Sequence, residues 1–259
     1  MAVSHLNLIA LPGFPLVQPG DKLASMVLDS LARAGESLRT NDILVVAQKI
    51  VSKSENCYVE LADITPSAQA IALAAEVDKD PRLIEVILSE SKEVVRTAPG
   101  VCIVEHKLGY VMANAGVDAS NIRHQGNGKE RVLLLPKDPD RSAAELASLL
   151  SRSAGVTIGV VINDSVGRAW RNGTVGLALG AAGFPALYDR RGEQDLFGRT
   201  LEVSEVALAD QLAAAAALLQ GEGDEGQPVV LVRGLSWPVN TPVNKAEALL
   251  RPKNKDLFR

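Results

Sequence analysis

Two short stretches of the chain combine a carboxylate with other polar groups. The first contains Asp118 and reads Asn-Ala-Gly-Val-Asp-Ala-Ser-Asn over residues 114–121. In the second, Asp164 is followed directly by Ser165 and soon afterwards by Arg168. Hard cations such as Mg²⁺ prefer oxygen ligands, usually one or two carboxylates together with substrate phosphates. Arginine donates to phosphate oxygens. The two stretches are therefore candidates for a metal and phosphate site.

Both stretches also have a purely structural interpretation. An Asx-type turn that closes a hairpin would explain Asp118, and a solvated strand–loop junction with surface arginines would explain Asp164. Lys53 follows an apolar run and could reach a phosphate, but most such lysines are merely solvated. Because each acid follows an apolar run, the functional interpretation of the pair is better supported than that of either acid alone.

The apolar runs predict the elements that position these residues. Strands are expected at 5–11, 43–48, 101–105, 110–114, 156–163 and 228–234, and helices at 21–34 and 204–220. Proline suits the first helical turn, so Thr65–Pro66 and Asp80–Pro81 predict two further helix starts. Ser142 with Glu145 predicts a capping box that opens a helix to about residue 151. Both candidate acids would then lie where a strand ends.

Glycines mark two other regions. Residues 167–198 are rich in glycine and have no clean period, which predicts either a functional loop system or closely packed backbone. Gly221, Gly223 and Gly226 match the spacing of a dinucleotide-binding loop. That loop needs a strand before it and a helix after it, whereas here the predicted order is reversed. A helix C-cap and a flexible loop explain these glycines instead.

Composition excludes several classes of protein. The chain has 259 residues, a net charge of −4, 47% hydrophobic residues and 3% aromatic residues. Such a chain can bury a core of Ala, Val, Leu and Ile without staples, and it has no basic excess for a broad nucleic-acid surface. Cys57 and Cys102 are expected to be buried thiols, and the three histidines form no zinc pattern. No signal peptide or membrane span is predicted, which favours the cytoplasm.

Eight ordered motifs resemble those of the coenzyme F-420-0:L-glutamate ligase family. They occupy residues 16–21, 42–55, 89–96, 114–121, 134–143, 163–173, 192–201 and 232–235, and the closing residues 256–259 match as well. The resemblance implies a GTP- and metal-dependent ligase that adds L-glutamate through a γ-linked amide to a deazaflavin coenzyme precursor, releasing GDP and phosphate. The expected route is an acyl phosphate on the precursor's carboxylate, which the glutamate amine then displaces.

The resemblance also implies roles for particular residues. Asp118 and Asp164 are similar to the family's metal-binding acids, and Ser165 stands where a hydroxyl ligand of a second metal is expected. Lys53 and Arg168 would assist phosphate transfer. Contacts with GTP are implied for Pro12, Gly13, Phe14, Pro15, Gln48, Lys53, Asn121, Gln220, Gly221, Glu222, Gly223, Asp224 and Glu225. The expected ions are Mg²⁺ or Mn²⁺, with K⁺ as a further candidate.

For the fold, the resemblance implies an α+β protein with two interleaved domains and an intertwined homodimer. The ligase region is expected at 1–236 and a C-terminal tail at 237–259, without the reductase-like domain that some relatives add. The family commonly has threonine where this chain has Ser165, and Gln48 lies in a variable stretch. Two alternatives remain: a ligase of the same fold with another acid acceptor, such as a folate-like or pterin-like one, or a catalytically silent nucleotide-binding protein.

Overall fold

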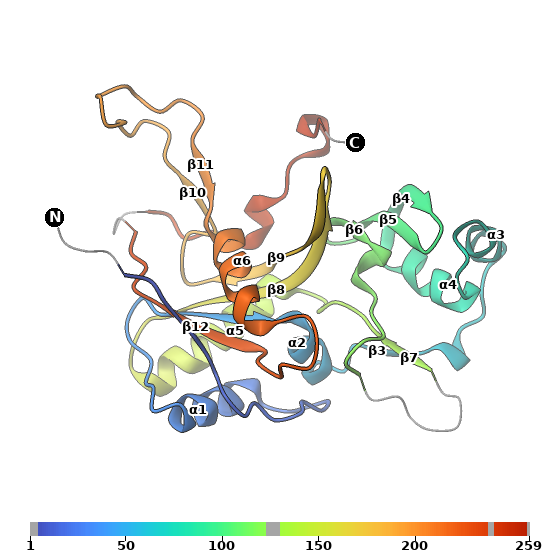
Figure 1. Cartoon of the computed structure of the whole chain (residues 1–259), viewed down its shortest axis with the longest axis horizontal. Helices are drawn as coiled ribbons and strands as arrows, with labels where there is room; N and C mark the ends of the chain where they lie inside the picture. Colours follow the sequence, from blue (N-terminus) through green and yellow to red (C-terminus); the bar gives the residue numbers. More distant parts are fainter. Residues whose placement is uncertain (1–4, 123–129, 238–240, 258–259) are drawn as a thin grey trace.

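A five-stranded sheet forms the centre of the molecule (Figure 1). The computed structural model describes residues 5–122, 130–237 and 241–257. Within the sheet, β2 and β8 run parallel, and the other neighbouring strands pair antiparallel. The strands, in spatial order, are β1 (Asn7–Ala10), β12 (Val229–Arg233), β2 (Ile43–Ala47), β8 (Gly159–Arg168) and β9 (Arg171–Ala182). Strands from both ends of the chain therefore build one sheet.

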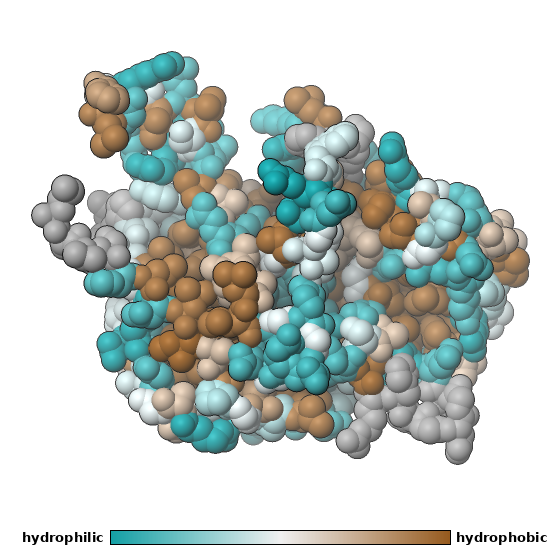
Figure 2. Space-filling model, viewed as in Figure 1, coloured by the Kyte–Doolittle hydropathy of each residue, from teal (hydrophilic) through white to brown (hydrophobic). Residues whose placement is uncertain are grey.

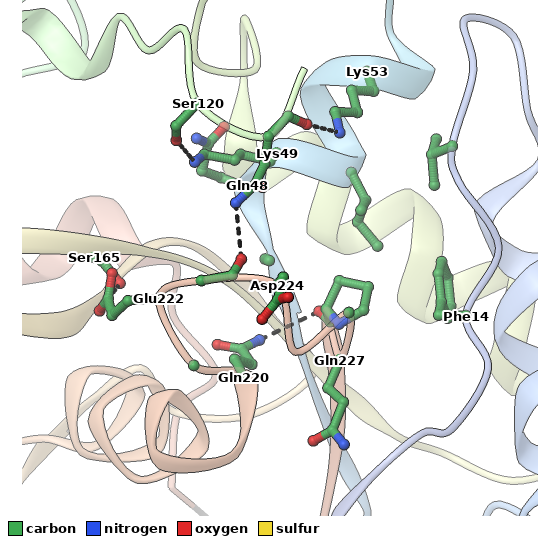
Figure 3. Close-up of a pocket in the computed structure, with 18 of the residues that line it drawn as sticks. Phe14, Gln48, Lys49, Lys53, Ser120, Ser165, Gln220, Glu222, Asp224 and Gln227 are labelled. Atoms are coloured by element: carbon green, nitrogen blue, oxygen red, sulfur yellow. Dashed lines mark hydrogen bonds between the residues drawn. The ribbon is translucent and has the colours of Figure 1, made fainter. Parts of the chain in front are cut away.

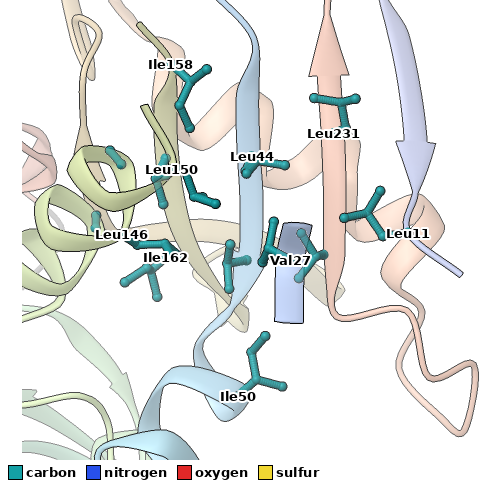
Figure 4. Packing of buried hydrophobic residues seen from close by; sticks show 14 of the residues in the cluster. Leu11, Val27, Leu44, Ile50, Leu146, Leu150, Ile158, Ile162 and Leu231 are labelled. Carbon is teal, nitrogen blue, oxygen red and sulfur yellow. The ribbon is translucent and has the colours of Figure 1, made fainter. Parts of the chain in front are cut away.

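Helices cover both faces of this sheet. On one face, α1 (Leu23–Arg33) and α5 (Pro139–Ala154) pack against Leu44 and Val46 of β2 (Figure 4). On the other face, α6 (Leu208–Gln220) packs against Val45. Successive side chains of a strand point to opposite faces. Because each face meets a helix, β2 is apolar at every position, as expected for a strand buried on both sides.

Two glycines of β9 let these helices approach the sheet closely. A Cβ atom at Gly176 would lie 2.3 Å from the carbonyl oxygen of Ala213 in α6, and one at Gly180 would lie 2.2 Å from that of Pro139 in α5. At these positions the glycine-rich region is closely packed backbone, the second of its two interpretations. Further along, β10 (Leu187–Asp189) pairs with β11 (Glu205–Ala207). The loop between them, residues 190–204, projects from the molecule with apolar residues at its tip (Figure 2).

Residues 58–133 build a second group of elements beside the central sheet. A three-stranded sheet packs against two helices around its own apolar cluster. A short ladder of two strands lies next to it. The elements are β3 (Tyr58–Glu60), α3 (Ala68–Val77), α4 (Pro81–Ser89), β4 (Ser91–Ala98), β5 (Val101–His106), β6 (Val111–Ala113) and β7 (Arg131–Leu133), with 3-10 turns at Leu61–Asp63 and Asn114–Gly116. The predicted hairpin of residues 101–114 is confirmed as β5–β6.

The helix starts agree with the sequence in part. Asp80 caps α4 by accepting the N–H of Arg82, as predicted. Helix α3 begins after Ser67, slightly later than the Thr65–Pro66 signal. The predicted capping box is wrong: α5 begins at Pro139 with Asp138 as its cap, and Ser142 lies inside the helix. Its hydroxyl donates instead to Glu55, at 2.5 Å.

The carboxylate of Asp140 fastens the C-terminal segment to the central sheet. It accepts the N–H groups of Ala181 in β9 and of Ala246 and Glu247, all at 2.8–3.2 Å. Short 3-10 turns follow at Ala246–Leu249 and Lys253–Lys255. The mixture of helices and mostly antiparallel sheets confirms the α+β class. The predicted limits of the domains and tail stay predictions, as does the intertwined dimer. In the described part of the chain, no helix is long and apolar enough to cross a membrane.

Candidate functional site

Parallel pairing of β2 and β8 brings together two polar segments that are far apart in the sequence. Ala47, the last residue of β2, pairs with Asn163 of β8. Helix α2 (Gln48–Ser54) begins directly after β2, so its first residues lie beside Asp164. The sequence predicted that Asp164 lies at the end of a strand. This is wrong, because β8 continues to Arg168. The pairing of β8 with β9 shifts register between Ile162 and Asn163, just before this acid.

A pocket of about 490 Å³ opens at this edge of the sheet (Figure 3). Five segments of the chain contribute to its wall. They are residues 14–17, 47–50 with Lys53, 118 with 120–121, 163–165, and 220–224 with 226–228. The pocket therefore gathers both candidate acids, Lys53 and most of the expected nucleotide contacts.

Asp118 is held by two neighbours. Its Oδ2 lies 2.7 Å from Nζ of Lys49, while Ser120 donates to it through its backbone N–H at 2.7 Å and its hydroxyl at 2.9 Å. Burial acts to raise the pKa of Asp118, but the hydrogen bonds from Lys49 and Ser120 outweigh it, and the pKa falls below its usual value. Asp118 is therefore a stable carboxylate.

The pKa of Asp164 is shifted in the opposite direction from that of Asp118. Burial raises its pKa to about 6, and the negative charge of Asp118 acts in the same direction. Hydrogen bonds from the backbone of Ser165 and the side chain of Gln48 oppose this rise without cancelling it. Gln48 is only 2% exposed, and its Oε1 accepts the hydroxyl of Ser52 at 2.9 Å. A positive charge near Asp164 would relieve the cost of ionising it.

Ser165 and Thr174 both donate to one carboxylate oxygen of Glu222. The two distances to Oε1 are 2.7 Å from Ser165 and 3.0 Å from Thr174. Ser165 was a candidate metal ligand and Glu222 a candidate nucleotide contact, and the structure brings them together. Thr174 could not be predicted as a site residue, because it lies on the next strand and outside the polar motifs.

Lys53 lines the pocket and donates to the backbone oxygen of Asn121 at 2.6 Å. Its pKa is lowered by burial first, and then by the positive charges of Lys49 and Arg131. The side chain of Asn121 donates to the backbone oxygen of Gly223 at 3.1 Å. Asn121 therefore links the wall that contains Lys53 to the loop on the opposite wall.

The loop that follows α6 is anchored at both ends. Gln220 exchanges hydrogen bonds of 2.7 and 3.2 Å with Asn163, and it also donates to the backbone oxygen of Pro228 at 3.3 Å. Gly221 ends the helix with a φ of 71°, which confirms the predicted glycine C-cap. Within the loop, Glu225 accepts the N–H of Gly223 at 2.8 Å.

Four of the expected site residues lie outside the pocket wall. Glu225 bonds to its own loop, and Pro12 and Gly13 are exposed beside Phe14. Arg168 lies at the end of β8 and donates to the backbone oxygen of Gly173 at 3.0 Å within the β8–β9 hairpin. Conversely, Lys49 contacts Asp118 directly, although it is not among the expected site residues.

The oxygen-rich wall fits a divalent cation. Asp118, Asp164, Ser165 and Glu222 all offer oxygen atoms, the ligands that Mg²⁺ and Mn²⁺ prefer. Among the residues that the structure describes, no three His, Cys, Asp or Glu side chains converge on one metal position. Mg²⁺ characteristically uses one or two carboxylates, with water and substrate phosphates completing its coordination. The pocket has room for such a phosphate, with Lys49 and Lys53 on its wall.

Comparison with known proteins assigns the chain to a family. Residues 13–234 match the model of the F420-0:Gamma-glutamyl ligase family. The chain is 42% identical to the coenzyme F420:L-glutamate ligase of Methanothermobacter thermautotrophicus, over 98% of this chain and 99% of that protein. It is 45% identical to the protein of the same name from Methanopyrus kandleri, over 94% of this chain and 93% of that protein. The chain therefore belongs to the F420-0:gamma-glutamyl ligase family and is a ligase.

Proposed function

We propose that this protein uses GTP to join L-glutamate, through a γ-linked amide, to the deazaflavin precursor coenzyme F420-0. The observation that supports this most directly is one pocket containing Asp118, Asp164 and two lysines. Carboxylates that bind a cation, beside lysines that bind phosphate oxygens, are what phosphoryl transfer requires of a protein. The names of the relatives supply the amino acid and the coenzyme.

The proposed reaction has two steps. A carboxylate oxygen of the precursor bonds to the γ-phosphorus of GTP as the bond to the β–γ bridging oxygen breaks, so GDP leaves. The amine of glutamate then bonds to the acyl carbon and gives up a proton, while the carbon–oxygen bond to phosphate breaks. The products are an amide, GDP and phosphate. Amide formation in water is uphill, and the cleavage of GTP drives it.

The residues of the pocket have distinct tasks in this scheme. Asp118 and Asp164, with Ser165 and Glu222, would hold Mg²⁺ or Mn²⁺, which when bound would neutralise the charge of the phosphates. Lys53 lies on the wall with its ammonium on the backbone oxygen of Asn121, from which it can turn to a phosphate oxygen. Gln48 orients Asp164, and Gln220 fixes the loop that closes the site. Arg168 lies outside the wall, so its assistance would require movement of the β8–β9 hairpin.

Product analysis tests the proposal. The protein is incubated with GTP, Mn²⁺, L-glutamate and coenzyme F420-0, and products are identified by mass spectrometry while GDP and phosphate are measured. We expect the precursor to gain one glutamate residue per GTP cleaved. A panel of other acids, including folate-like and pterin-like acceptors, should give no comparable product. GTP cleavage with no glutamate adduct on coenzyme F420-0 would disprove the proposed acceptor.

We also propose that a second copy of the chain covers the projecting loop between β10 and β11. Within this loop, Leu196 and Phe197 are 98% and 95% exposed. Trp170, at the turn between β8 and β9, is 84% exposed. Leu196 and Phe197 are neighbours in the chain, and adjacent large apolar side chains that are exposed mark interaction sites. Light scattering should give the mass of a dimer, and Phe197→Ser should shift it toward the monomer. A monomeric mass for the unaltered protein would exclude the dimer.

A further inference from the structure

The pocket has two chemically different ends. One end contains the oxygen ligands and Lys49, and the other is marked by Phe14, which packs against the apolar cluster that includes Ile50. Figure 3 shows Phe14 on the side away from Ser165 and Glu222, with Asp224 between them. A nucleoside triphosphate has the same division, because its phosphates are charged and its base is an uncharged, flat aromatic ring. The base therefore belongs at the Phe14 end, where an aromatic ring can stack on it.

Asp224 is the unengaged acid of the loop after α6. Glu222 accepts the hydroxyls of Ser165 and Thr174, and Glu225 accepts the N–H of Gly223. Asp224 also lines the pocket, and in the described part of the chain its carboxylate has no hydrogen-bond or ion-pair partner. Two of the loop's acids are thus engaged by other groups of the protein, and the third lines the pocket without such a partner.

The backbone that bears Asp224 is held from both sides. Next to it, Gly223 is fixed through its carbonyl by Asn121 and through its N–H by Glu225. The ends of the loop are anchored by Gln220, which bonds to Asn163 and Pro228. A ligand that meets Asp224 therefore does not have to order the loop first, which lowers the entropic cost of binding.

We infer that Asp224 recognises the edge of the base and makes the site selective for guanine. This inference rests on the proposed use of GTP. Guanine presents two adjacent donors, N1–H and the 2-amino group, which match the two acceptor oxygens of an ionised carboxylate. Adenine presents the N1 lone pair at the same place and would be repelled. Selectivity then comes from a favourable pair with one base and an unfavourable pair with the other.

The test compares Asp224→Asn with the unaltered protein, using GTP, ITP, XTP and ATP as probes. Inosine lacks the 2-amino group, and xanthine has an oxygen in its place. In the unaltered protein, ITP should bind about 10- to 100-fold more weakly than GTP, because a charge-assisted hydrogen bond is lost. The asparagine amide can donate to the 2-oxygen of xanthine, so Asp224→Asn should lose GTP affinity by a similar factor and gain affinity for XTP.

Binding is measured by calorimetry with Mn²⁺, and glutamate-dependent release of phosphate is measured with each triphosphate. Asp29→Asn is the matched control, because Asp29 is exposed on α1 and lies outside the pocket wall. This variant should keep the order of the four nucleotides. Gain of XTP affinity cannot result from misfolding, so it separates recognition from damage to the loop.

The outcomes separate this inference from the proposed function. If the unaltered protein uses GTP but Asp224→Asn retains its preference for GTP over XTP, base recognition by Asp224 is excluded and the GTP-dependent ligase stands. A folded variant that loses GTP without gaining XTP also excludes recognition of the two donors. If none of the triphosphates supports glutamate-dependent phosphate release in the unaltered protein, the proposed function itself fails.

Discussion

The ammonium group of Lys49 lies 2.7 Å from Oδ2 of Asp118 and 2.6 Å from the hydroxyl of Ser120. Lys49 belongs to α2, next to the central sheet, whereas Asp118 follows the elements of residues 58–113. The contact therefore joins the two groups of elements across the pocket. It also places a positive charge on one of the proposed metal-binding carboxylates, so a bound cation and Lys49 would compete for Asp118.

Replacement of Asp118 should abolish most of the activity without unfolding the protein. In Asp118→Asn, the amide can still accept the N–H of Ser120, but the negative charge for the cation and Lys49 is gone. Glutamate-dependent release of phosphate should fall about 100-fold or more, the scale for removing one preorganised electrostatic contact from a catalytic site. Ser120→Ala, which removes only a hydroxyl beside Asp118, should have a smaller effect. Equal activity of Asp118→Asn and the unaltered protein would exclude the proposed role.

Asp164→Asn should stabilise the metal-free protein at pH 8. Folding raises the pKa of Asp164 from 3.8 to about 6, so the unfolded chain loses this proton more readily. The folded state is therefore penalised increasingly as pH rises from about 4 to above 6, by up to about 2–3 kcal/mol. Asparagine cannot ionise and should remove this penalty, so its benefit should be present at pH 8 and absent at pH 4.

Urea unfolding of the metal-free protein at both pH values measures this effect. Asp118→Asn is the contrasting variant, because hydrogen bonds lower the pKa of Asp118 and its charge is stabilising. It should reduce stability at pH 8. At each pH, the free energy of unfolding of Asp164→Asn is compared with that of the unaltered protein. If the gain from the substitution is not larger at pH 8 than at pH 4, the raised pKa assigned to Asp164 is contradicted.

Gly180→Ala should destabilise the fold. The added methyl group would lie 2.2 Å from the carbonyl oxygen of Pro139, which is backbone and cannot turn aside. Overpacking of this kind typically costs about 1–3 kcal/mol. Gly167→Ala is the matched control in the neighbouring strand, since nothing lies within 4 Å of its Cβ position. Thermal unfolding should show a clear loss for the first variant and little change for the second.

The two thiols should react slowly with disulfide reagents in the native state. Burial raises the pKa of Cys57 to about 11 and raises that of Cys102 as well. At pH 8, roughly one Cys57 side chain in a thousand is then a thiolate, the form that reacts. Absorbance measurements with an aromatic disulfide should show two thiols that react fast in urea and slowly without it. Fast reaction of either thiol in the native protein would contradict its burial.

The sequence by itself determined the local elements and the candidate chemistry. The apolar runs 43–48 and 228–234 correspond to β2 and β12, and Asp80 caps the helix it was expected to cap. Asp118, Asp164 and Lys53 were recognised from their types, and the family motifs around them gave the expected reaction. These features depend on residues within one or two turns of each other, so a linear pattern contains them.

Only the tertiary structure decided which of these segments meet. The pairing of Ala47 with Asn163 and the contact of Lys49 with Asp118 join residues that are far apart in the chain. Periodicity reports whether a strand is buried but not which strand lies beside it, so it could not place Thr174 next to Glu222 or Asp164 within a strand. The elevated pKa of Asp164 has the same origin, because burial and a neighbouring charge are supplied by other segments once the chain has folded.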